Sequence, residues 1–480
     1  MASHHYEFLF IGSGQSANPL AKTFANNGHS TGLIERSSVG GTCVNVGCTP
    51  TKTMIASGRV AYLASRGAEY GVHGGATDGV TVDMKKVRER KRNIVAQWHS
   101  GSERGLEKAG VECMFGEGSF VSEKEVLVKC EGGRERLVSA DTIFISTGER
   151  PAKPDIVGLD EVDPSRVLDS TSIMELDAAP KHLVVLGGGY IGLEFGQLFR
   201  RFGAEVTVVQ RAKQLVPRED EDVAAAMLEI LKEDGLSVHL SSTVASVSKS
   251  GSADLPITVN VSTPDGEKAI EGSHILVAAG RVPNTDMLNL KAAGVETTSR
   301  GHVVVNEQLQ TTAKGIYALG DVHGGPAFTH MSYDDFRIIR TNLLPSAVPS
   351  THPRMPTTTA STSRVLVPYV MFTDPQLAHI GLHERDLAAT GRQIKRATMP
   401  MSYVARAAET AETRGLMKAS VDGDTGEILG FTCLGMEGGE IMAVVQMAMM
   451  GGLKWWDLEG AVLTHPSLSE SLNNLWGYLK

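Results

Sequence analysis

The stretch Tyr6-Glu-Phe-Leu-Phe-Ile-Gly-Ser-Gly-Gln-Ser-Ala17 decides the fold, because a buried apolar run passes directly into a glycine-rich turn and then into helical spacing. Gly12 permits a tight turn, Gly14 lets a pyrophosphate approach the backbone, and Ala17 is small enough for a helix to pack on a strand. The helix N-terminus then faces the phosphates. The pattern predicts a dinucleotide-binding βαβ unit, although a plain glycine turn between strand and helix can look the same.

Glu35 supports the first of these interpretations. It ends the next predicted strand, at the spacing of about 20 residues where a carboxylate accepts hydrogen bonds from the ribose of an adenosine. A second unit of the same kind begins at His182 and carries Gly187-Gly-Gly189-Tyr-Ile-Gly192. Two such units predict two dinucleotides, a flavin and a nicotinamide.

The second unit lacks the acidic residue of an NAD site. Its next strand, Glu205 to Val209, is followed by Gln210-Arg211. Arg211 and Lys213 can pair with a 2′-phosphate, which favours NADPH over NADH. The alternative is that both side chains are ordinary surface charges.

The most specific segment is Gly40-Gly-Thr-Cys43-Val-Asn-Val-Gly-Cys48-Thr-Pro-Thr-Lys52. Cysteines five apart in an ideal helix have Cα atoms roughly 8–9 Å apart, whereas a disulfide needs about 4.4–6.8 Å. If the two bond, the helix must therefore be interrupted between them, and Gly47 is where the backbone can give way.

The residues after this pair predict a helix start. Thr49-Pro50 is typical of an N-cap followed by proline at the first helical position. Cys48 then lies beside a helix N-terminus, where a thiolate is favoured, and Lys52 adds positive charge. Two packed free thiols and a metal site remain as alternatives for the pair.

Length and composition narrow the class of protein. The 480 residues allow about three domains at roughly 150 residues each. The net charge of −9 argues against a nucleic-acid partner. No segment approaches the roughly 20 apolar residues of a membrane span, and we expect neither a membrane partner nor a signal peptide. We expect a cytoplasmic protein, in which a close cysteine pair is catalytic or metal-binding rather than structural.

Taken in order along essentially the whole chain, these segments resemble the class I flavoprotein disulfide reductases, which include dihydrolipoamide dehydrogenase, glutathione reductase and mercuric reductase. The resemblance implies that Cys43 and Cys48 form a redox-active disulfide. It also implies that Tyr190 gates the nicotinamide pocket and that Glu194 pairs with Lys52 beside the flavin. Three further segments match family motifs: Ser146-Thr-Gly148 and Gly280-Arg-Val-Pro-Asn284 at domain junctions, and Ile316-Tyr-Ala-Leu-Gly-Asp321, whose aspartate binds the ribityl chain of FAD.

The C-terminal segment Thr464-His-Pro-Ser-Leu-Ser-Glu470 resembles the family's His–Glu pair. In that family the histidine is an acid/base contributed by the opposite subunit. The resemblance therefore implies a homodimer with its active site across the interface. Without that context, His465 would be an ordinary polar side chain.

Two features separate this chain from mercuric reductase itself. It ends Trp476-Gly-Tyr-Leu-Lys480 without the vicinal cysteine pair of that enzyme, and it has the His465-Pro466 motif that the enzyme lacks. Mercury reduction is therefore disfavoured, although Thr49–Lys52 resembles it. Phe328–Arg337 resembles instead the reactive-chlorine-resistance flavoprotein branch, which is linked to oxidant defence and to reduction of copper(II) or hypothiocyanous acid.

We therefore predict an α/β protein with two doubly wound, Rossmann-like domains and a C-terminal α+β dimerisation domain. The expected division is an FAD domain at 1–150 and 280–350, an NAD(P) domain at 151–279 and an interface domain at 351–480. The expected activity is FAD-dependent oxidation of NADPH, or alternatively NADH, with a small oxidised thiol, disulfide or oxidant as substrate. Dihydrolipoamide dehydrogenase, mercuric reductase and a non-catalytic FAD redox sensor are the alternatives.

The predicted site residues fall into two groups. The catalytic group is Cys43, Cys48, Lys52, Glu194, His465 and Glu470. The cofactor-binding group is Gly12, Gly14, Ala17, Glu35, Gly41, Thr42, Thr147, Gly148, Gly187, Gly189, Tyr190, Gly192, Arg211, Gly280, Arg281, Gly320 and Asp321. No resident metal is expected.

Overall fold

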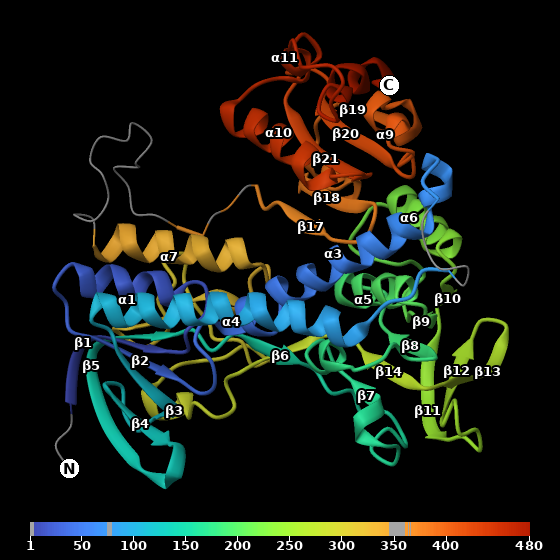
Figure 1. The fold of residues 1–480 in the computed structure, drawn as a ribbon. Helices are drawn as coiled ribbons and strands as arrows, with labels where there is room; N and C mark the ends of the chain where they lie inside the picture. The colour runs from blue at the N-terminus through green and yellow to red at the C-terminus, as the bar shows by residue number, and fades with distance from the viewer. Residues whose placement is uncertain (1–3, 74–78, 345–360, 363, 365) are drawn as a thin grey trace. The chain divides into compact units, whose positions relative to one another are not determined.

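The computed structural model describes residues 4–73, 79–344, 361–362, 364 and 366–480. They belong to two compact units, each assembled from three separate stretches of chain (Figure 1). The first unit comprises Met1–Thr53, Arg88–Ala152 and Gly280–Arg364, and the second comprises Met54–Val87, Lys153–Ala279 and Val365–Lys480. The predicted boundary at residue 350 lies outside the described residues.

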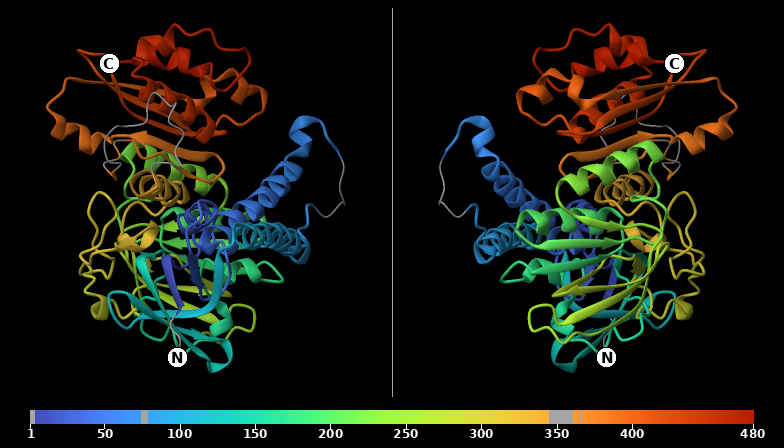
Figure 2. Two further views of the ribbon diagram at one scale, coloured as in Figure 1. Left: turned by 90° about the vertical axis from the view of Figure 1, so that its left-hand side faces the viewer. Right: turned by 90° about the vertical axis from the view of Figure 1, so that its right-hand side faces the viewer.

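The first unit is built on a sheet whose central strand is β1 (His4–Ile11), which lies inside the sheet in both views of Figure 2. The parallel strands run in the order β3 (Glu112–Phe120), β2 (Thr31–Glu35), β1, β5 (Glu135–Ile145) and β16 (Ile316–Ala318). A further strand, β4 (Glu125–Cys130), pairs antiparallel with both β3 and β5. This order is that of a doubly wound nucleotide-binding sheet.

Helix α1 (Ala17–Asn26) shows why this segment folds as predicted. Its buried residues Ala17, Leu20, Ala21 and Phe24 follow the spacing of one helix face. Phe24 stacks on Phe8 of β1 with ring centroids 3.8 Å apart. Burying a side chain of this size stabilises the fold by about 1.5–3 kcal/mol. Two further helices belong to the layers around this sheet: α4 (Met84–Ala109), most of which is in the first unit, and α7 (Thr329–Leu343).

The second unit contains a parallel sheet of the same type, in the order β10 (Ser237–His239), β9 (Glu205–Val209), β8 (His182–Leu186), β14 (His274–Val277) and β7 (Val167–Leu168). All five residues of β8 are buried, as expected of a central parallel strand covered on both faces. Its helices are α5 (Tyr190–Arg201) and α6 (Glu221–Glu233). A three-stranded antiparallel sheet follows, made of β11 (Thr243–Lys249), β12 (Ile257–Thr263) and β13 (Gly266–Gly272).

The C-terminal part of the second unit is an antiparallel sheet with helices packed against it. Its strand order is β17 (Tyr369–Met371), β18 (Gln376–Gly381), β21 (Ile428–Gly435), β20 (Leu416–Asp422) and β19 (Ile394–Pro400). The helices are α8 (Glu384–Leu387), α9 (Ala405–Glu409), α10 (Gly438–Gly451), α11 (Trp455–Glu459) and α12 (Ser471–Leu475). The predicted α/β class is thus confirmed: two doubly wound sheets and a C-terminal α+β part.

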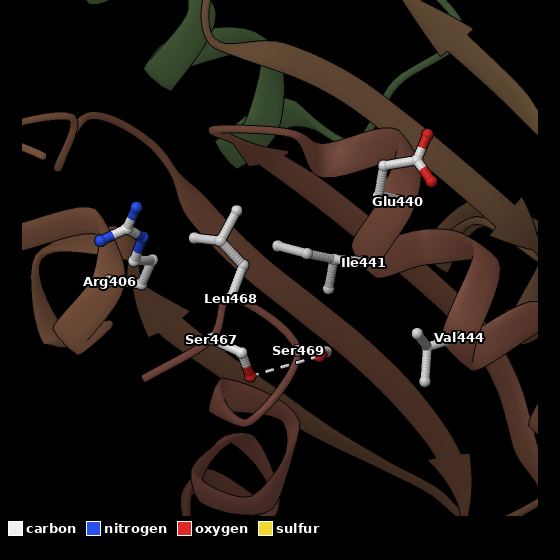
Figure 3. A pocket seen from close by; sticks show the side chains of 7 residues that line it. All are labelled: Arg406, Glu440, Ile441, Val444, Ser467, Leu468 and Ser469. Carbon is white, nitrogen blue, oxygen red and sulfur yellow. Dashed lines mark hydrogen bonds between the residues drawn. The ribbon is translucent and has the colours of Figure 1, made fainter. Parts of the chain in front are cut away.

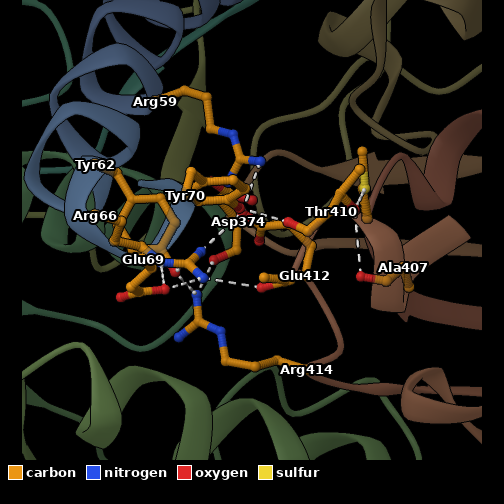
Figure 4. Close-up of polar contacts among 12 residues, drawn as sticks. Arg59, Tyr62, Arg66, Glu69, Tyr70, Asp374, Ala407, Thr410, Glu412 and Arg414 are labelled. Atoms are coloured by element: carbon orange, nitrogen blue, oxygen red, sulfur yellow. Dashed lines mark hydrogen bonds and ion pairs between the residues drawn. The ribbon is translucent and has the colours of Figure 1, made fainter. Parts of the chain in front are cut away.

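Charged residues around Tyr62 hold together the stretches that make up the second unit (Figure 4). The guanidinium groups of Arg201 and Arg66 lie 4.0 and 5.0 Å from the centre of the Tyr62 ring. Arg201 also pairs with Asp374 at 2.6 Å, and Arg66 pairs with Glu412 at 2.9 Å. Because these groups are mostly buried, removing one partner would leave an uncompensated charge, which typically costs about 3–5 kcal/mol.

Among the helices that the structure describes, none combines the length and the apolar character that crossing a bilayer requires.

Candidate active site

The two cysteines lie on two successive helices with a break between them. Cys43 is in α2 (Gly41–Asn45), and Cys48 is the first residue of α3 (Cys48–Ser65). Val46 leaves the helical conformation (φ −141°, ψ 12°), so the helix is interrupted beside Gly47, as predicted. The helix begins two residues earlier than Thr49-Pro50 had suggested, because the carbonyl of Gly47 already accepts a hydrogen bond from Thr51 at 3.1 Å.

The cysteine segment packs directly on the first glycine turn. A Cβ at Gly41 would lie 2.8 Å from the Cα of Gly14, and Gly41 has a φ of +65°. Both observations exclude a larger residue at position 41. The backbone that carries Cys43 is therefore fixed against the backbone that would face the pyrophosphate.

The two thiols interact with each other rather than behaving independently. Cys43 is half-buried and Cys48 is exposed, and both are thiols in this structure. A hydrogen bond with Cys48 raises the pKa of the Cys43 thiol, and burial raises it further. The proton of the pair thus stays on Cys43, and a negative charge on the reduced pair falls on Cys48.

Thr329 is a neighbour of the pair that the sequence did not reveal. Its hydroxyl Oγ1 lies 3.4 Å from the Sγ of Cys48, and it is the first residue of α7. Thr329 and Lys52 both lower the pKa of Cys43, but by less than Cys48 and burial raise it. A hydroxyl and a helix N-terminus beside Cys48 both favour negative charge there.

The first glycine turn is shaped by contacts that only glycine allows. Gly12 has a φ of +96°, and a Cβ there would lie 2.3 Å from the carbonyl oxygen of Ser146. Glu35, at the end of β2, is 8% exposed. Its carboxylate accepts hydrogen bonds from the backbone N–H of Ser13 at 3.1 Å and of Ser37 at 2.9 Å. The carboxylate is thus held at the position that an adenosine ribose would reach.

The predicted junction residues surround Asp321 within the first unit. Gly148 has a φ of +63°, and no described atom lies within 4 Å of a Cβ built there. Burial raises the pKa of Asp321 to about 6, with a further rise from the charge of Glu149. Thr147 donates to the carbonyl of Asn284 at 2.8 Å. Gly320 donates its N–H to Asp335 at 2.7 Å, which fixes the turn carrying Asp321. A buried carboxyl and an open glycine position fit the hydroxyl-bearing chain of a flavin dinucleotide.

Arg281 is engaged by protein groups. It follows Gly280 and lies in β15 (Arg281–Pro283), which pairs with β6 (Glu149–Pro151). Its guanidinium contacts the Glu149 carboxylate at 3.3 Å and donates to the Glu149 carbonyl at 2.7 Å. The structure therefore gives Arg281 a role in tying two strands, which leaves its predicted cofactor contact as a prediction.

The second glycine turn repeats the first in its backbone. Gly187 has a φ of +116°, and a Cβ there would lie 2.6 Å from the carbonyl oxygen of Ala278. A Cβ at Gly192 would lie 2.1 Å from the carbonyl of Gly187, so the helix packs tightly on the turn. No described atom lies within 4 Å of a Cβ built at Gly189, the N-cap of α5. This open position beside a helix N-terminus fits a pyrophosphate.

The position corresponding to Glu35 is taken by Gln210. Its Oε1 accepts the backbone N–H of Gly188 at 3.2 Å, and its Nε2 donates to the carbonyl of Gln214 at 3.2 Å. Arg211 is exposed and has no ion pair among the described residues. Lys213, in contrast, pairs with Glu221, so of the two predicted phosphate ligands only Arg211 keeps its charge uncompensated.

Glu194 and Lys52 lie in separately described units, and their predicted pairing stays a prediction. Glu194 is buried within α5 and accepts the backbone N–H of Phe372 at 2.7 Å. Lys52 is in the first turns of α3, where its charge acts on Cys43.

His465 and Glu470 form the pair that the sequence predicted. The Nδ1 of His465 lies 3.0 Å from both carboxylate oxygens of Glu470. The side chain of His465 is 72% exposed, whereas that of Glu470 is 19% exposed. When Nδ1–H donates to the carboxylate, Nε2 keeps its lone pair and can accept a proton. The ring is thus oriented by a half-buried carboxylate and presented to the outside.

A cavity lies beside this pair. It has a volume of about 390 Å³ and is lined by residues of α10 and of the segment after His465, among them Ile441, Ser467 and Ser469 (Figure 3). Its lining combines apolar side chains with the charged groups of Arg406 and Glu440 and the hydroxyls of the two serines.

Comparisons with known proteins agree with this geometry. Residues 6–335 match the family of pyridine nucleotide-disulphide oxidoreductases, and residues 367–475 match the dimerisation domain of that family. The chain is 34% identical to a probable pyridine nucleotide-disulfide oxidoreductase RclA of Escherichia coli, with 99% of both chains covered. It is 35% identical to a mercuric reductase of Staphylococcus aureus, over 97% of this chain and 81% of the relative. A solved copper(II) complex of the HOCl-induced flavoprotein disulfide reductase RclA from Escherichia coli superposes with a TM-score of 0.86 at 33% identity, over 99% of both chains.

Proposed function

The chain belongs to the pyridine nucleotide-disulphide oxidoreductases, and from this premise we propose that it oxidises NADPH and reduces a small oxidised substrate through the Cys43–Cys48 pair. The observation that carries the proposal is the pair of thiols on two successive helices, whose backbone is fixed against the first glycine turn. Two adjacent thiols can deliver two electrons by closing into a disulfide.

The first unit would hold FAD, and the second would hold the reduced nucleotide. When bound, FAD supplies the two-electron carrier between the nicotinamide and the cysteine disulfide. Gly12, Gly14 and Glu35 would hold its adenosine diphosphate end. The contacts toward its flavin end would come from Gly41, Thr42, Thr147, Gly148, Gly320 and Asp321. This assignment supports the division into an FAD domain at 1–150 and 280–350 and an NAD(P) domain at 151–279.

The two cysteines would have different roles in the reaction. Cys43 keeps the proton of the reduced pair, so it needs a base before it can attack. Its thiolate then forms a bond to the oxidised atom of the substrate and displaces the reduced half or a hydroxide. Cys48 attacks the Cys43 sulfur next, which releases the reduced product and closes the disulfide. Thr329, at 3.4 Å, stabilises the thiolate of Cys48 in the interval.

His465 of a second copy would be that base. The dimerisation domain of the family covers residues 367–475, and His465 is exposed and oriented by Glu470. Its imidazole would take the proton of Cys43 and return it to the leaving group. This role requires a homodimer whose active sites combine residues of both copies.

The nucleotide is NADPH because of the residues after β9. Gln210 has no negative charge to repel a 2′-phosphate, and Arg211 has an uncompensated positive one. An acid at position 210 would instead favour the two ribose hydroxyls of NADH.

The substrate would be an oxidant or metal ion rather than a bulky disulfide peptide. The relative from Escherichia coli is described as HOCl-induced and was solved with copper(II). An exposed Cys48 beside a half-buried Cys43 leaves room for a small acceptor such as hypothiocyanous acid or copper(II). We place this reaction in the cytoplasm, where a reducing poise keeps such a pair cycling under oxidative stress.

A substrate screen tests the proposal. The FAD-loaded protein is mixed anaerobically with NADPH and one of five acceptors: glutathione disulfide, lipoamide, hypothiocyanous acid, copper(II) or mercury(II). We expect NADPH oxidation with one of the small oxidants and none with Cys43→Ser. Equal turnover by wild type and Cys43→Ser, or a strong NADH preference with lipoamide, would contradict the proposal.

A further inference from the structure

A chain of buried hydrogen bonds begins at Tyr190 in the second unit. Tyr190 is the first residue of α5, and its hydroxyl donates to the Oε1 of Glu219 at 3.1 Å. The hydroxyl of Tyr369 donates to the same oxygen at 2.7 Å. Nε2 of His383 lies 2.9 Å from that Tyr369 hydroxyl, and since Tyr369 has spent its only proton, the imidazole is the donor there.

Glu219 is poorly compensated for so buried a carboxyl group. Its side chain belongs to a residue that is 4% exposed, and burial raises its pKa. Its second oxygen, Oε2, has no hydrogen-bond partner within the described parts of the chain, and the same holds for Nδ1 of His383. The two phenols are therefore its hydrogen-bond donors in the structure, and losing one leaves a buried carboxylate with a single donor.

The far end of the chain is anchored by charge. Nδ1 of His383 lies 3.7 Å from a carboxylate oxygen of Asp220. Lys418 lies 3.2 Å from the other oxygen of Asp220 and 2.8 Å from Asp222. His383 and Tyr369 lie outside the glycine turn, and within the chain of hydrogen bonds Glu219 and His383 are buried whereas the two phenols are half-buried.

We propose that Glu219 is a positioning residue that holds Tyr190 in its nucleotide-free position, so that nucleotide binding must break the Tyr190–Glu219 hydrogen bond, and that Tyr369, held by His383, is the donor that then remains on Glu219. The inference rests on the proposed function, with Tyr190 placed beside the nicotinamide as the family resemblance implies. It adds a specific cost to nucleotide binding, set by residues that touch neither the nucleotide nor the cysteines.

The same cluster has the composition of a metal site, but its geometry favours the hydrogen-bond chain. Ligand atoms of Glu219, His379 and His383 all lie within 4.8 Å of one another. However, His379 bonds Thr432 through Nδ1 at 2.8 Å and the carbonyl of Gly381 through Nε2 at 3.1 Å. The two imidazole rings also stack at 3.7 Å with an interplanar angle of 5°. Stacked rings direct their nitrogens sideways in parallel planes rather than toward one ion.

Stopped-flow reduction of the flavin in the FAD-loaded protein tests the proposal. In Glu219→Gln we expect the apparent Kd for NADPH to fall about fivefold, the size of one ordinary hydrogen bond. In Tyr369→Phe, where Tyr190 is the last donor to Glu219, we expect the apparent Kd to rise by about the same factor. The limiting rate of flavin reduction stays within about twofold in both variants. Tyr62→Phe, which removes another half-buried phenol of the same unit, leaves the Kd unchanged. In a Tyr190→Phe background, Tyr369→Phe has no further effect, because it acts through Tyr190.

Nitration of Tyr190 by tetranitromethane, followed by peptide mass spectrometry, supplies a readout that needs no nucleotide. We expect faster nitration of Tyr190 in Glu219→Gln, and slower nitration in Tyr369→Phe, than in wild type or Tyr62→Phe. An unchanged Kd together with unchanged nitration would overturn the proposal. So would stoichiometric zinc or copper in the purified protein that His383→Ala removes, since the cluster would then be a metal site. A wild-type flavin that NADPH does not reduce would instead contradict the proposed function, and the nitration rates would still decide whether Glu219 holds Tyr190.

Discussion

The first and second glycine turns bind their own strands in the same way, but with side chains of different charge. In the first turn, a carboxylate oxygen of Glu35 accepts the N–H of Ser13, the residue after Gly12. In the second, the amide oxygen of Gln210 accepts the N–H of Gly188, the residue after Gly187. The contact that shapes the turn thus needs an acceptor and no charge. The presence or absence of a negative charge at this position is therefore available for a second purpose, the discrimination between a 2′-hydroxyl and a 2′-phosphate on the ribose.

Substitutions in the backbone that the two glycine turns share should have the largest effect. Gly12→Ala would put a Cβ 2.3 Å from Ser146 in the first turn, and Gly187→Ala would put one 2.6 Å from Ala278 in the second. Both glycines have positive φ, so the clash adds to backbone strain. We expect Gly12→Ala to lose FAD and Gly187→Ala to stay yellow, with flavin reduction by NADPH slowed about 1,000-fold or more, an effect of about 4 kcal/mol.

Absorbance at 450 nm after gel filtration and anaerobic stopped-flow separate the two outcomes. Gly132→Ala, at a surface glycine with no described atom within 4 Å of the new Cβ, controls for a general effect of adding a side chain at positive φ. If Gly187→Ala bleaches the protein as Gly12→Ala does, the two turns do not serve separate dinucleotides.

Asp321, at the flavin end of the first cofactor site, should make the stability of the protein without FAD depend on pH. Burial raises the pKa of Asp321 from 3.8 to about 6, so the folded protein without FAD binds this proton more tightly than the unfolded chain does. The contribution of Asp321 is complete below about pH 3.8 and is lost as pH rises through about 6. The full contribution of Asp321 to the free energy of unfolding is about 3 kcal/mol, because its pKa is raised from 3.8 to about 6 in the folded protein.

Asp321→Asn removes the titrating group and nearly keeps its shape. The difference in the free energy of unfolding between this variant and wild type, both without FAD, should change by about 3 kcal/mol in favour of the variant between pH 4 and pH 7. Urea unfolding followed by circular dichroism measures it. A difference independent of pH would show that Asp321 is charged in both states.

Exchanging the two acceptors tests what the charge is for. Gln210→Glu should keep the turn intact and shift the ratio of kcat/KM for NADPH over NADH about 100-fold toward NADH, because a carboxylate repels a 2′-phosphate and accepts from ribose hydroxyls. Glu35→Gln should keep its hydrogen bond to Ser13 and weaken FAD binding about tenfold, since a hydrogen bond to a charged group is worth more than a neutral one. Ser248→Glu, at an exposed position of β11, serves as the charge control. Unaltered coenzyme preference in Gln210→Glu would separate this position from specificity.

The smallest effect concerns the two basic residues beyond Gln210. Arg211→Ala should raise the KM for NADPH about tenfold and leave the KM for NADH unchanged, with a loss that shrinks as salt screens the charge. Lys213→Ala should change either value less than about twofold, because Lys213 already pairs with Glu221. Steady-state kinetics at low and high salt decide. Equal losses in both variants would mean that the Lys213–Glu221 pair opens when the nucleotide binds.

The features that the sequence predicted are those carried by short stretches of chain. The glycine turns and Glu35 each lie within one βαβ unit, where strand and helix periods fix the spacing, whereas the His465–Glu470 pair was expected from the family resemblance. Hence the fold class was within reach before any coordinates, and the roles of the site residues stay predictions.

The features that escaped prediction join residues far apart in the chain. Thr329 meets Cys48 across 281 positions, and Tyr369 meets Glu219 across 150. No period or motif marks such contacts, since they depend on which helix end or strand edge faces which loop. The pairing of Lys213 with Glu221 was missed for a related reason, because a local motif shows which charges are present but not which are already neutralised.

The place where Gly41 touches Gly14 also limits how this chain could be re-engineered. Because Gly41 leaves no room for a Cβ against the backbone of Gly14, the sulfur-bearing segment and the anion-binding turn form a single unit. A graft of Cys43–Cys48 into another flavoprotein would have to include residues 12–17. Without them, the two sulfur atoms would not be positioned correctly against the flavin ring.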